Sequence, residues 1–415
     1  MATKEGRILP ITAKERPAFW ATFMGWGLDG FDYMMYALVL TAMIRAFHLS
    51  DAAGGLIGTT TLIFSAFGGM LAGTVADRIG RVRTLALAVI VYSAFTALSG
   101  LATSFPELLV FRAAEGLGFG GEWAVGAVLI AETVRGPVRG RVLGFVQGAW
   151  AFGWALAVIA SIIILPVAGA VGWRIMFFLG VLPALLSVYI LRKVKEPEVW
   201  VKAQTKSNRN TGVSFFRIFS PALLRRTIFA ALLAVGAQSG YYAIFTWLPT
   251  YLKVDRHLSV IGSSGYLAII IVGSFAGYVL SGYINDGLGR KATFAIYAIF
   301  SGLIILVYTH FSISPGIMMV LSFPLGFFAS GIFSGFGPFL AELFPTESRG
   351  AGQGFTYNFG RGVAGFAPFL VGTLASSYGL AAGISIFGPA AYILCLIALL
   401  FLPETKGADL ARASA

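Results

Sequence analysis

The chain has 415 residues, of which 57% are hydrophobic and only 12% are charged. Soluble domains carry about twice that charged fraction, so the composition excludes a soluble globular protein and is typical of a helical membrane protein. The single cysteine excludes an intrachain disulfide framework and a Cys-based zinc site, and three histidines argue against a His-rich metal site. The net charge of +12 is spread over the chain, with no soluble basic module for a nucleic-acid partner.

Twelve apolar runs follow one another along the chain, each near the roughly 20 residues that a helix needs to cross a bilayer. Their limits are 18–44, 54–76, 84–104, 107–131, 141–166, 172–191, 226–252, 260–284, 292–311, 316–341, 351–376 and 380–402. The sequence therefore predicts an all-α membrane protein with 12 transmembrane helices.

The basic residues predict how the chain is oriented in the membrane. Of the 30 Lys and Arg residues, 24 lie in segments on the side of the two termini, and only four lie on the opposite side. The remaining two, Arg112 and Arg361, lie inside spans. Such a bias places both termini in the cytoplasm. We expect a multi-pass protein of the cell membrane, in contact with the lipid bilayer.

One long polar stretch divides the spans into six and six. It predicts an N-terminal six-helix bundle at 1–191, a cytoplasmic linker at 192–225 and a C-terminal six-helix bundle with a short tail at 226–415. The polar residues of the linker favour a solvated tether.

The two halves repeat each other. The pattern G-x3-D-x2-G-R occurs at 73–81 and again at 282–290, an offset of 209 residues. A second pattern, A-E-x6-R-G-x3-G-F, begins at Ala131 and at Ala341, an offset of 210. Both patterns follow equivalent spans, so the repeat is parallel. It predicts two pseudo-symmetric bundles around a central cavity, an arrangement suited to alternating access.

The charged residues of these patterns lie at the predicted cytoplasmic ends of the spans. Acids and bases at helix ends can latch one access state by charge pairing. The alternative is that they only anchor the spans on the positive side of the membrane. The predicted cytoplasmic gate consists of Asp77, Arg81, Glu132 and Arg139 in the first half and Asp286, Arg290, Glu342 and Arg349 in the second.

Three motifs resemble those of the major facilitator superfamily. They are the loop motif at 73–83, the R-x3-G-x-G-x-G motif at 112–120 and the Pro-Glu-Thr-Lys-Gly signature at 403–407. Within the superfamily, 28–32 (Leu-Asp-Gly-Phe-Asp) and 120–123 (Gly-Gly-Glu-Trp) resemble the proton-coupled organic-acid branches, which carry sialate, aromatic acids or small carboxylates. The resemblance implies the major facilitator fold and transport of an organic acid.

Charged residues inside the spans are candidates for proton coupling, because charge is costly in hydrocarbon and usually functional there. Asp29 and Asp32 lie three residues apart on one helix face and resist joint ionisation. The family counterpart of Arg112 is implicated in proton coupling. Glu122 is a second candidate proton site, and Glu115 is expected to brace Arg112. The alternatives are a permanent salt bridge of Arg112 to one of these acids and a protonated, hydrogen-bonded Glu122.

Arg361 is predicted to bind the substrate. By the repeat offset it matches Ala151, so its charge breaks the internal symmetry. A guanidinium in a cavity can hold a carboxylate with two parallel hydrogen bonds. The alternative is that backbone carbonyls or a tyrosine satisfy it.

Polar-tipped side chains near Arg361 in the predicted cavity are further substrate-binding candidates, because amphipathic groups suit a pocket for an organic acid. For each aromatic among them, ordinary packing is the competing interpretation. The set consists of Tyr357, Asn358, Gln147, Gln238, Tyr241 and Tyr242.

These residues predict a proton-coupled symporter that imports a small organic carboxylate, with protons as the coupling ion and neither cofactor nor metal. The chain is expected to be a monomer and not an enzyme. No Walker motif is present, which argues against ATP as the energy source. The first alternative is a proton-coupled antiporter that exports drugs or cationic metabolites. The second is a sensor or facilitator on the same scaffold.

Overall fold

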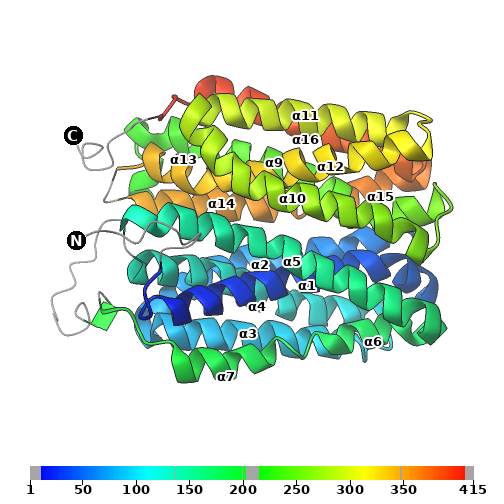
Figure 1. The fold of residues 1–415 in the computed structure, drawn as a ribbon, viewed down its shortest axis with the longest axis horizontal. Helices are drawn as coiled ribbons and strands as arrows, with labels where there is room; N and C mark the ends of the chain where they lie inside the picture. Colours follow the sequence, from blue (N-terminus) through cyan, green and yellow to red (C-terminus); the bar gives the residue numbers. More distant parts are fainter. Residues whose placement is uncertain (1–10, 135, 199, 202–214, 346–347, 407–415) are drawn as a thin grey trace.

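The computed structural model describes residues 11–134, 136–198, 200–201, 215–345 and 348–406, without the side chains of 136–141 and 215. The described residues form helices and contain no β-strand. Helix α1 begins and α16 ends at the same end of the molecule, which we call the terminal end (left in Figure 1), and we call the opposite end the far end.

The helices of the first half lie together on one side of the molecule (Figure 1). They are α1 (Arg16–Ala46), α2 (Asp51–Ile79), α3 (Arg81–Ser99), α4 (Phe105–Thr133), α5 (Gly136–Ala168), the 3₁₀ helix η1 (Gly169–Val171), α6 (Gly172–Leu179) and α7 (Ala184–Lys193).

The helices of the second half lie on the other side (Figure 1). They are η2 (Phe215–Phe219), α9 (Pro221–Val254), α10 (Val260–Leu288), α11 (Arg290–His310), α12 (Pro315–Gly331), η3 (Ile332–Gly335), α13 (Phe336–Leu343), α14 (Arg349–Ala364), α15 (Ala367–Tyr378) and α16 (Leu380–Phe401). The limits 1–191, 192–225 and 226–415 stay a prediction, and 202–214 of the expected linker lie outside the described residues.

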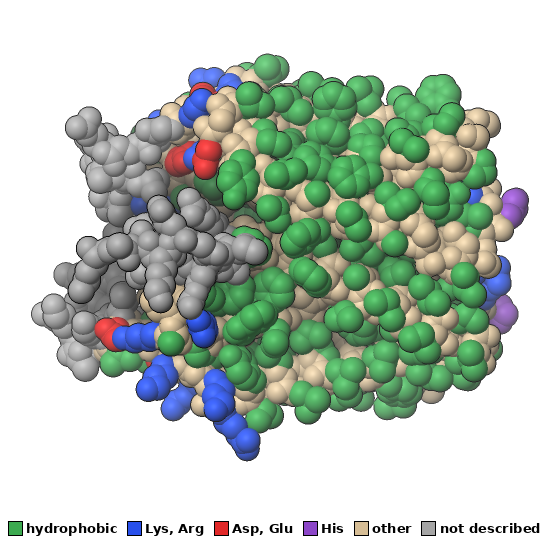
Figure 2. Space-filling view, viewed as in Figure 1, with side chains coloured by type: hydrophobic (Ala, Val, Ile, Leu, Met, Phe, Trp, Pro, Cys, Tyr) green, Lys and Arg blue, Asp and Glu red, His purple; other side chains and the backbone are tan. Residues whose placement is uncertain are grey.

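Apolar side chains cover much of the face of the molecule seen in Figure 2, and most of the charged ones on this face lie at its terminal end. Within the described residues, eight helical segments are long and apolar enough to cross a membrane, one of them running through both the fifth and sixth spans. The first, fourth and eleventh predicted spans do not reach that apolarity. These three spans carry the buried charges Asp29, Asp32, Arg112, Glu115, Glu122 and Arg361.

Three predicted spans are divided rather than continuous. The sixth is split into α6 and α7 around Pro183, and the tenth changes to 3₁₀ geometry between α12 and α13. The eleventh is split into α14 and α15 at Gly365 and Phe366, just before Pro368. Proline removes a backbone donor, which explains breaks beside Pro183 and Pro368. The break in the eleventh span falls one turn beyond Arg361.

The internal repeat extends to the helix caps. Ser50 and its counterpart Ser259 begin α2 and α10, and each accepts a hydrogen bond from the backbone three residues on. Ser104 and Ser314 do the same for α4 and α12. A serine at this position satisfies an amide that the helix itself leaves free. Equivalent spans therefore begin by the same local chemistry at the far end.

At the terminal end, α3 and α11 begin after glycines in the left-handed region, Gly80 (φ 105°) and Gly289 (φ 102°). A distant carboxylate caps each helix. Glu196 accepts hydrogen bonds from the backbone N–H groups of Arg81 (2.8 Å) and Val82 (3.0 Å). Glu404 accepts the equivalent bonds from Arg290 (2.9 Å) and Lys291 (3.0 Å). A Cβ on Gly80 would collide with Glu196, so only glycine fits both the turn and the cap.

The two bundles meet along their pseudo-two-fold axis. Thr41 of α1 and Thr250 of α9, which are 209 residues apart, share a hydrogen bond of 3.1 Å. The rings of Tyr33 and Tyr242, separated by the same offset, lie 5.4 Å apart between centroids. Equivalent positions touch only where the axis passes between them. The Tyr33–Tyr242 and Thr41–Thr250 contacts therefore mark this axis along α1 and α9.

We expect Glu404→Ala to lower the free energy of unfolding by about 1 kcal/mol at pH 7, as the loss of a helix cap does. Burial raises the pKa of Glu404, but its backbone hydrogen bonds outweigh burial and hold that pKa below the ordinary 4.5. The contribution is therefore full above pH ~4.5 and is lost as the pH falls through the lowered pKa. Thermal unfolding in detergent at pH 7 and pH 3 measures it. Equal destabilisation at both values would contradict a charged cap, and Glu404→Gln, which keeps one acceptor oxygen, serves as the control.

Candidate functional site

Four carboxyl groups and two guanidinium groups lie buried where α1, α4 and α14 meet. All six side chains are at most 1% exposed. They form two clusters at different depths. The Arg112 cluster contains Asp32, Glu115 and Arg112, and the Arg361 cluster contains Asp29, Glu122 and Arg361. The acids at 29 and 32, expected to act as one pair, therefore have different nearest partners.

In the Arg112 cluster, the guanidinium pairs with the acid one turn along its own helix. Nη2 of Arg112 lies 3.3 Å from Oε2 of Glu115. The hydroxyl of Thr61 on α2 donates to the same Glu115 oxygen at 3.0 Å. The Arg112 guanidinium also lies over the rings of Tyr36 and Phe177, 5.3 Å and 5.5 Å from their centroids. Glu115 is therefore the salt-bridge partner of Arg112 in this structure, although the guanidinium makes no hydrogen bond of normal geometry among the described residues.

In the Arg361 cluster, part of the guanidinium makes no hydrogen bond. Nε and Nη1 of Arg361 have no hydrogen-bond partner among the described residues. The group lies 5.3 Å from the ring centroid of Tyr357 and 5.7 Å from that of Phe119. Its electrostatic neighbours include Tyr242 and Asp29. The hydroxyls of Tyr242 and Tyr357 also lie close enough to interact with the guanidinium, so the alternative of a tyrosine partner stays open. Nε and Nη1 still make no hydrogen bond of normal geometry among the described residues.

The two acids of this cluster are neighbours. Asp29 is flanked by Glu122, Asp32 and Arg361. The carboxylate oxygens of Asp29 and Glu122 lack a hydrogen bond of normal geometry within the described structure. Glu122 lies against Gly25 of α1, where any Cβ would collide with its Oε1. Gly25 therefore makes room for an acid of α4 beside an acid of α1.

Aromatic rings surround the Arg361 cluster. Trp26 of α1 lies 4.2 Å from Trp123 and 4.9 Å from Trp150, measured between ring centroids. Trp150 donates its indole N–H to the hydroxyl of Tyr241 across the two bundles, at 2.8 Å. Tyr33 forms a second bridge, 2.8 Å from the hydroxyl of Thr246. Flat rings with few polar tips therefore pack beside the charges of this cluster.

The predicted polar residues have different surroundings. Gln238 donates to the backbone carbonyl of Tyr357 at 3.1 Å and so supports α14 beside Arg361. Asn358 donates to the Gly354 carbonyl at 2.9 Å, while its Oδ1 has no described partner and faces Gly69 of α2. Gln147 is buried on α5. Tyr241 and Tyr242 are tied to the first bundle through Trp150 and Tyr33.

Sequence reasoning missed Trp26, Tyr33, Phe119 and Trp150. Each is an ordinary aromatic within an apolar span, and nothing in its local pattern separates it from packing. A signal existed for Tyr33, because the offset of 209 residues aligns it with the candidate Tyr242. Trp26 and Trp150 become neighbours only through the packing of α1 on α5.

The predicted gate residues form two equivalent ion-pair networks at the terminal end. Arg81 pairs with Asp77 at 2.8 Å and makes two bonds to Glu132, both 3.0 Å. Arg290 pairs with Asp286 at 2.9 Å and makes two bonds to Glu342, of 2.9 and 3.2 Å.

Two further predicted gate residues are Arg349 and Arg139. Nε of Arg349 donates to the Ala341 carbonyl at 2.8 Å, and the side chain of Arg139 lies outside the described residues. No group of three or more His, Cys, Asp or Glu side chains in the described part is arranged to hold a metal ion.

The profile of the Major Facilitator Superfamily matches residues 22–286 and 267–414, nearly the whole chain and both of its halves. The chain belongs to the major facilitator superfamily. It is therefore a multi-pass membrane transporter, and its two six-helix bundles are those of the superfamily.

This major facilitator is similar to transporters of organic acids. It is 36% identical over 395 residues to the "Probable 4-methylmuconolactone transporter" of Cupriavidus pinatubonensis, covering 95% of this chain and 92% of the relative. It is 31% identical to the "Cis,cis-muconate transport protein" of Acinetobacter baylyi, covering 94% of each. A solved structure of the xylose transporter XylE from E. coli, in a partially occluded inward open conformation, shares the fold. Its TM-score is 0.77 at 20% identity, over 96% of this chain and 100% of that one.

We expect Gly25→Ala to destabilise this major facilitator by about 1 kcal/mol, the low end of overpacking costs, because the added methyl must displace the flexible end of Glu122 within a packed interior. Gly144→Ala is the matched control, since a Cβ there meets no atom within 4 Å. Thermal unfolding measures both variants. Shortening the acid with Glu122→Asp should recover part of the loss in the Gly25→Ala background. An unchanged melting temperature in Gly25→Ala would contradict the described position of Glu122.

Proposed function

We propose that this transporter is a proton-coupled symporter that imports a small organic carboxylate by alternating access. One observation carries the proposal: Arg361 is a fully buried guanidinium beside a pair of buried acids, with two N–H groups that make no hydrogen bond of normal geometry. Unlike Arg112, it has no salt bridge among the described residues. A buried cation with free donors is matched by a carboxylate, which can accept both hydrogen bonds. A cationic cargo would instead be repelled by Arg361.

The rings packed near the Arg361 cluster favour a flat, unsaturated or aromatic acid within this class. Trp26, Trp123, Trp150 and Tyr242 offer ring faces and few hydrogen bonds. The names of the relatives support the same class, since two of them are described as carrying a muconolactone and cis,cis-muconate. A third relative, the "Sialic acid transporter NanX" of Escherichia coli, is 30% identical over 91% of each chain. A bulkier acid therefore stays within the proposal.

Charge balance supplies a reason for proton coupling. In the empty site, Asp29 and Glu122 offset the charge of Arg361. An arriving carboxylate takes over that role and would leave an excess of negative charge in a medium where an unpaired charge is costly. Protonation of Asp29 or Glu122 removes the excess, so substrate and proton bind better together than apart. This is a positive coupling between two ligands, and it is reciprocal.

The other predicted residues have supporting parts in this proposal. Asp32, which neighbours both Asp29 and Glu115, relays a proton between Asp29 and the Arg112 cluster. The gate residues Arg81 and Arg290 pair with acids of their own bundle, so they hold the terminal end of each bundle together while the bundles rock. With both termini in the cytoplasm, as the basic residues predict, the gate faces the cytoplasm. The protein acts as a monomer in the cell membrane.

We expect Arg361→Gln to weaken carboxylate binding roughly 30-fold or more, which corresponds to about 2 kcal/mol for one partner of a buried charged hydrogen bond. Thermal-shift titration with a panel of benzoate, muconate, lactate and sialate measures the binding in detergent. Arg83→Gln, which removes an equally charged but exposed side chain, is the control. Unchanged binding in Arg361→Gln would remove the carboxylate anchor, and stronger binding of organic cations would favour the antiporter.

We expect Asp29→Asn and Glu122→Gln to separate exchange from accumulation. A permanently neutral side chain mimics the protonated state, so substrate still exchanges across the membrane but no longer follows the proton gradient. Counterflow and gradient-driven uptake in proteoliposomes, with the internal and external pH set independently, measure the two activities. If both variants still accumulate substrate against its gradient, the coupling proton binds elsewhere.

A further inference from the structure

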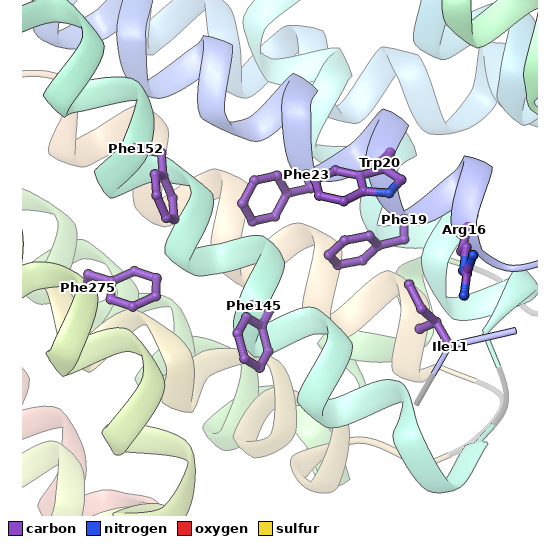
Figure 3. Close-up of a pocket in the computed structure, with 8 residues that line it drawn as sticks. All are labelled: Ile11, Arg16, Phe19, Trp20, Phe23, Phe145, Phe152 and Phe275. Carbon is purple, nitrogen blue, oxygen red and sulfur yellow. The ribbon is translucent and has the colours of Figure 1, made fainter. Parts of the chain in front are cut away.

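An apolar recess lies on the flank of the molecule, where the first bundle meets the second. Its volume is about 490 Å³, within the range of sites for small organic ligands. Six aromatic side chains form most of its lining (Figure 3): Phe19, Trp20 and Phe23 of α1, Phe145 and Phe152 of α5, and Phe275 of α10. No substrate-site residue named above takes part in this lining, so the recess is a separate feature.

The recess has one cationic end. Arg16, the first residue of α1, lies at that end together with Ile11, while Phe152 and Phe275 lie at the other (Figure 3). Since α1 begins at the terminal end, Arg16 stands where the apolar flank gives way to the charged surface. The Arg16 side chain is exposed, and no ion pair is described for it.

The contacts described for the neighbouring charges involve other residues than Arg16. Lys14 pairs with Glu198. Oε2 of Glu15 accepts hydrogen bonds from the backbone and the hydroxyl of Thr12, at 2.7 and 2.9 Å. The charge of Arg16 is thus available to an anion at the rim of the recess.

The floor of the recess is a joint between the two bundles. Phe152 of α5 and Phe275 of α10 meet edge to face, 5.4 Å between centroids. Gly148 of α5 lets the Phe275 ring approach, since a Cβ there would lie 3.1 Å from it. Trp20 and Phe152 remain 43% and 52% exposed. An exposed aromatic patch of this kind on a membrane-spanning flank is in contact with acyl chains.

We propose that this recess binds one anionic phospholipid, with the phosphate on Arg16 and an acyl chain along the six aromatic rings. We assign a lipid to this recess because its long apolar surface ends in a single cation at the membrane boundary, as a phospholipid's acyl chain ends in a headgroup. Arg16 fits the headgroup, and the indole of Trp20 has the amphipathic character of residues at that depth. A short, polar organic acid would find only one polar partner here.

Native mass spectrometry of the full-length protein in detergent tests the headgroup. With phosphatidylglycerol and phosphatidylcholine added in equal amounts, we expect roughly fivefold more bound phosphatidylglycerol, the preference that one basic residue near the surface provides. Arg16→Gln should abolish the preference, Arg16→Lys should keep it, and Arg83→Gln, the matched exposed control, should leave it unchanged. Equal preference in Arg16→Gln and Arg83→Gln would overturn the proposal.

Quenching by brominated acyl chains tests the recess independently of the charge. The Trp20 signal is the difference in fluorescence between the wild type and Trp20→Phe, measured in nanodiscs. We expect brominated phosphatidylglycerol to quench this signal more strongly than brominated phosphatidylcholine at the same fraction. Equal quenching by the two lipids would overturn the proposal. So would relief of the quenching by benzoate or muconate, since the recess would then be a substrate entry.

Discussion

Buried charge is the constraint around which this transporter is built. Ionisable groups inside a membrane protein are destabilising unless other groups balance them. Here the balance comes from placing acids of α1 beside acids and a base of α4, and then setting Arg361 of the second bundle against them. The three spans that carry these groups are also those that fall short of the apolarity of the other spans. Their position inside the molecule makes that composition tolerable.

The repeat shows which parts are framework and which are chemistry. Helix caps, gate ion pairs and the capping carboxylates occur in both halves at nearly one offset. The charged centre does not: Asp29 corresponds to Gln238, and Arg361 corresponds to Ala151. Gln238 nevertheless supports the backbone beside Arg361. The second half thus uses the position of an acid to hold the helix that carries the cation, which makes the two bundles complementary rather than equivalent.

Much of the fold was predictable from the sequence, because apolar length, basic bias and an internal repeat are all local or periodic signals. They gave the twelve spans and the two bundles, although not the breaks near Pro183 and Pro368. The clusters were less predictable. The spacing of Asp29 and Asp32 indicated a shared face, but it could not show that α4 would supply a separate partner for each. The pairing of Glu132 with Arg81 likewise depends on how α4 packs against α3.

The contact between Trp26, Trp123 and Trp150 was not predictable from the sequence for the same reason. Trp26, Trp123 and Trp150 come from three helices, and their contact depends on close approach at small residues. Gly30 of α1, for example, faces the backbone of Trp150 at a distance that leaves no room for a side chain. Composition records that glycines are abundant, but it does not tell which helices they bring together.

The capping carboxylates have a consequence for motion. Glu196 follows the last helix of the first bundle and returns to the start of α3, while Glu404 follows the last helix of the second and returns to the start of α11. In each bundle, the segment that follows the last helix is therefore fixed to the start of an earlier helix of the same bundle. Neither set of hydrogen bonds crosses to the other half. The halves can therefore tilt as two rigid bodies while both sets stay intact.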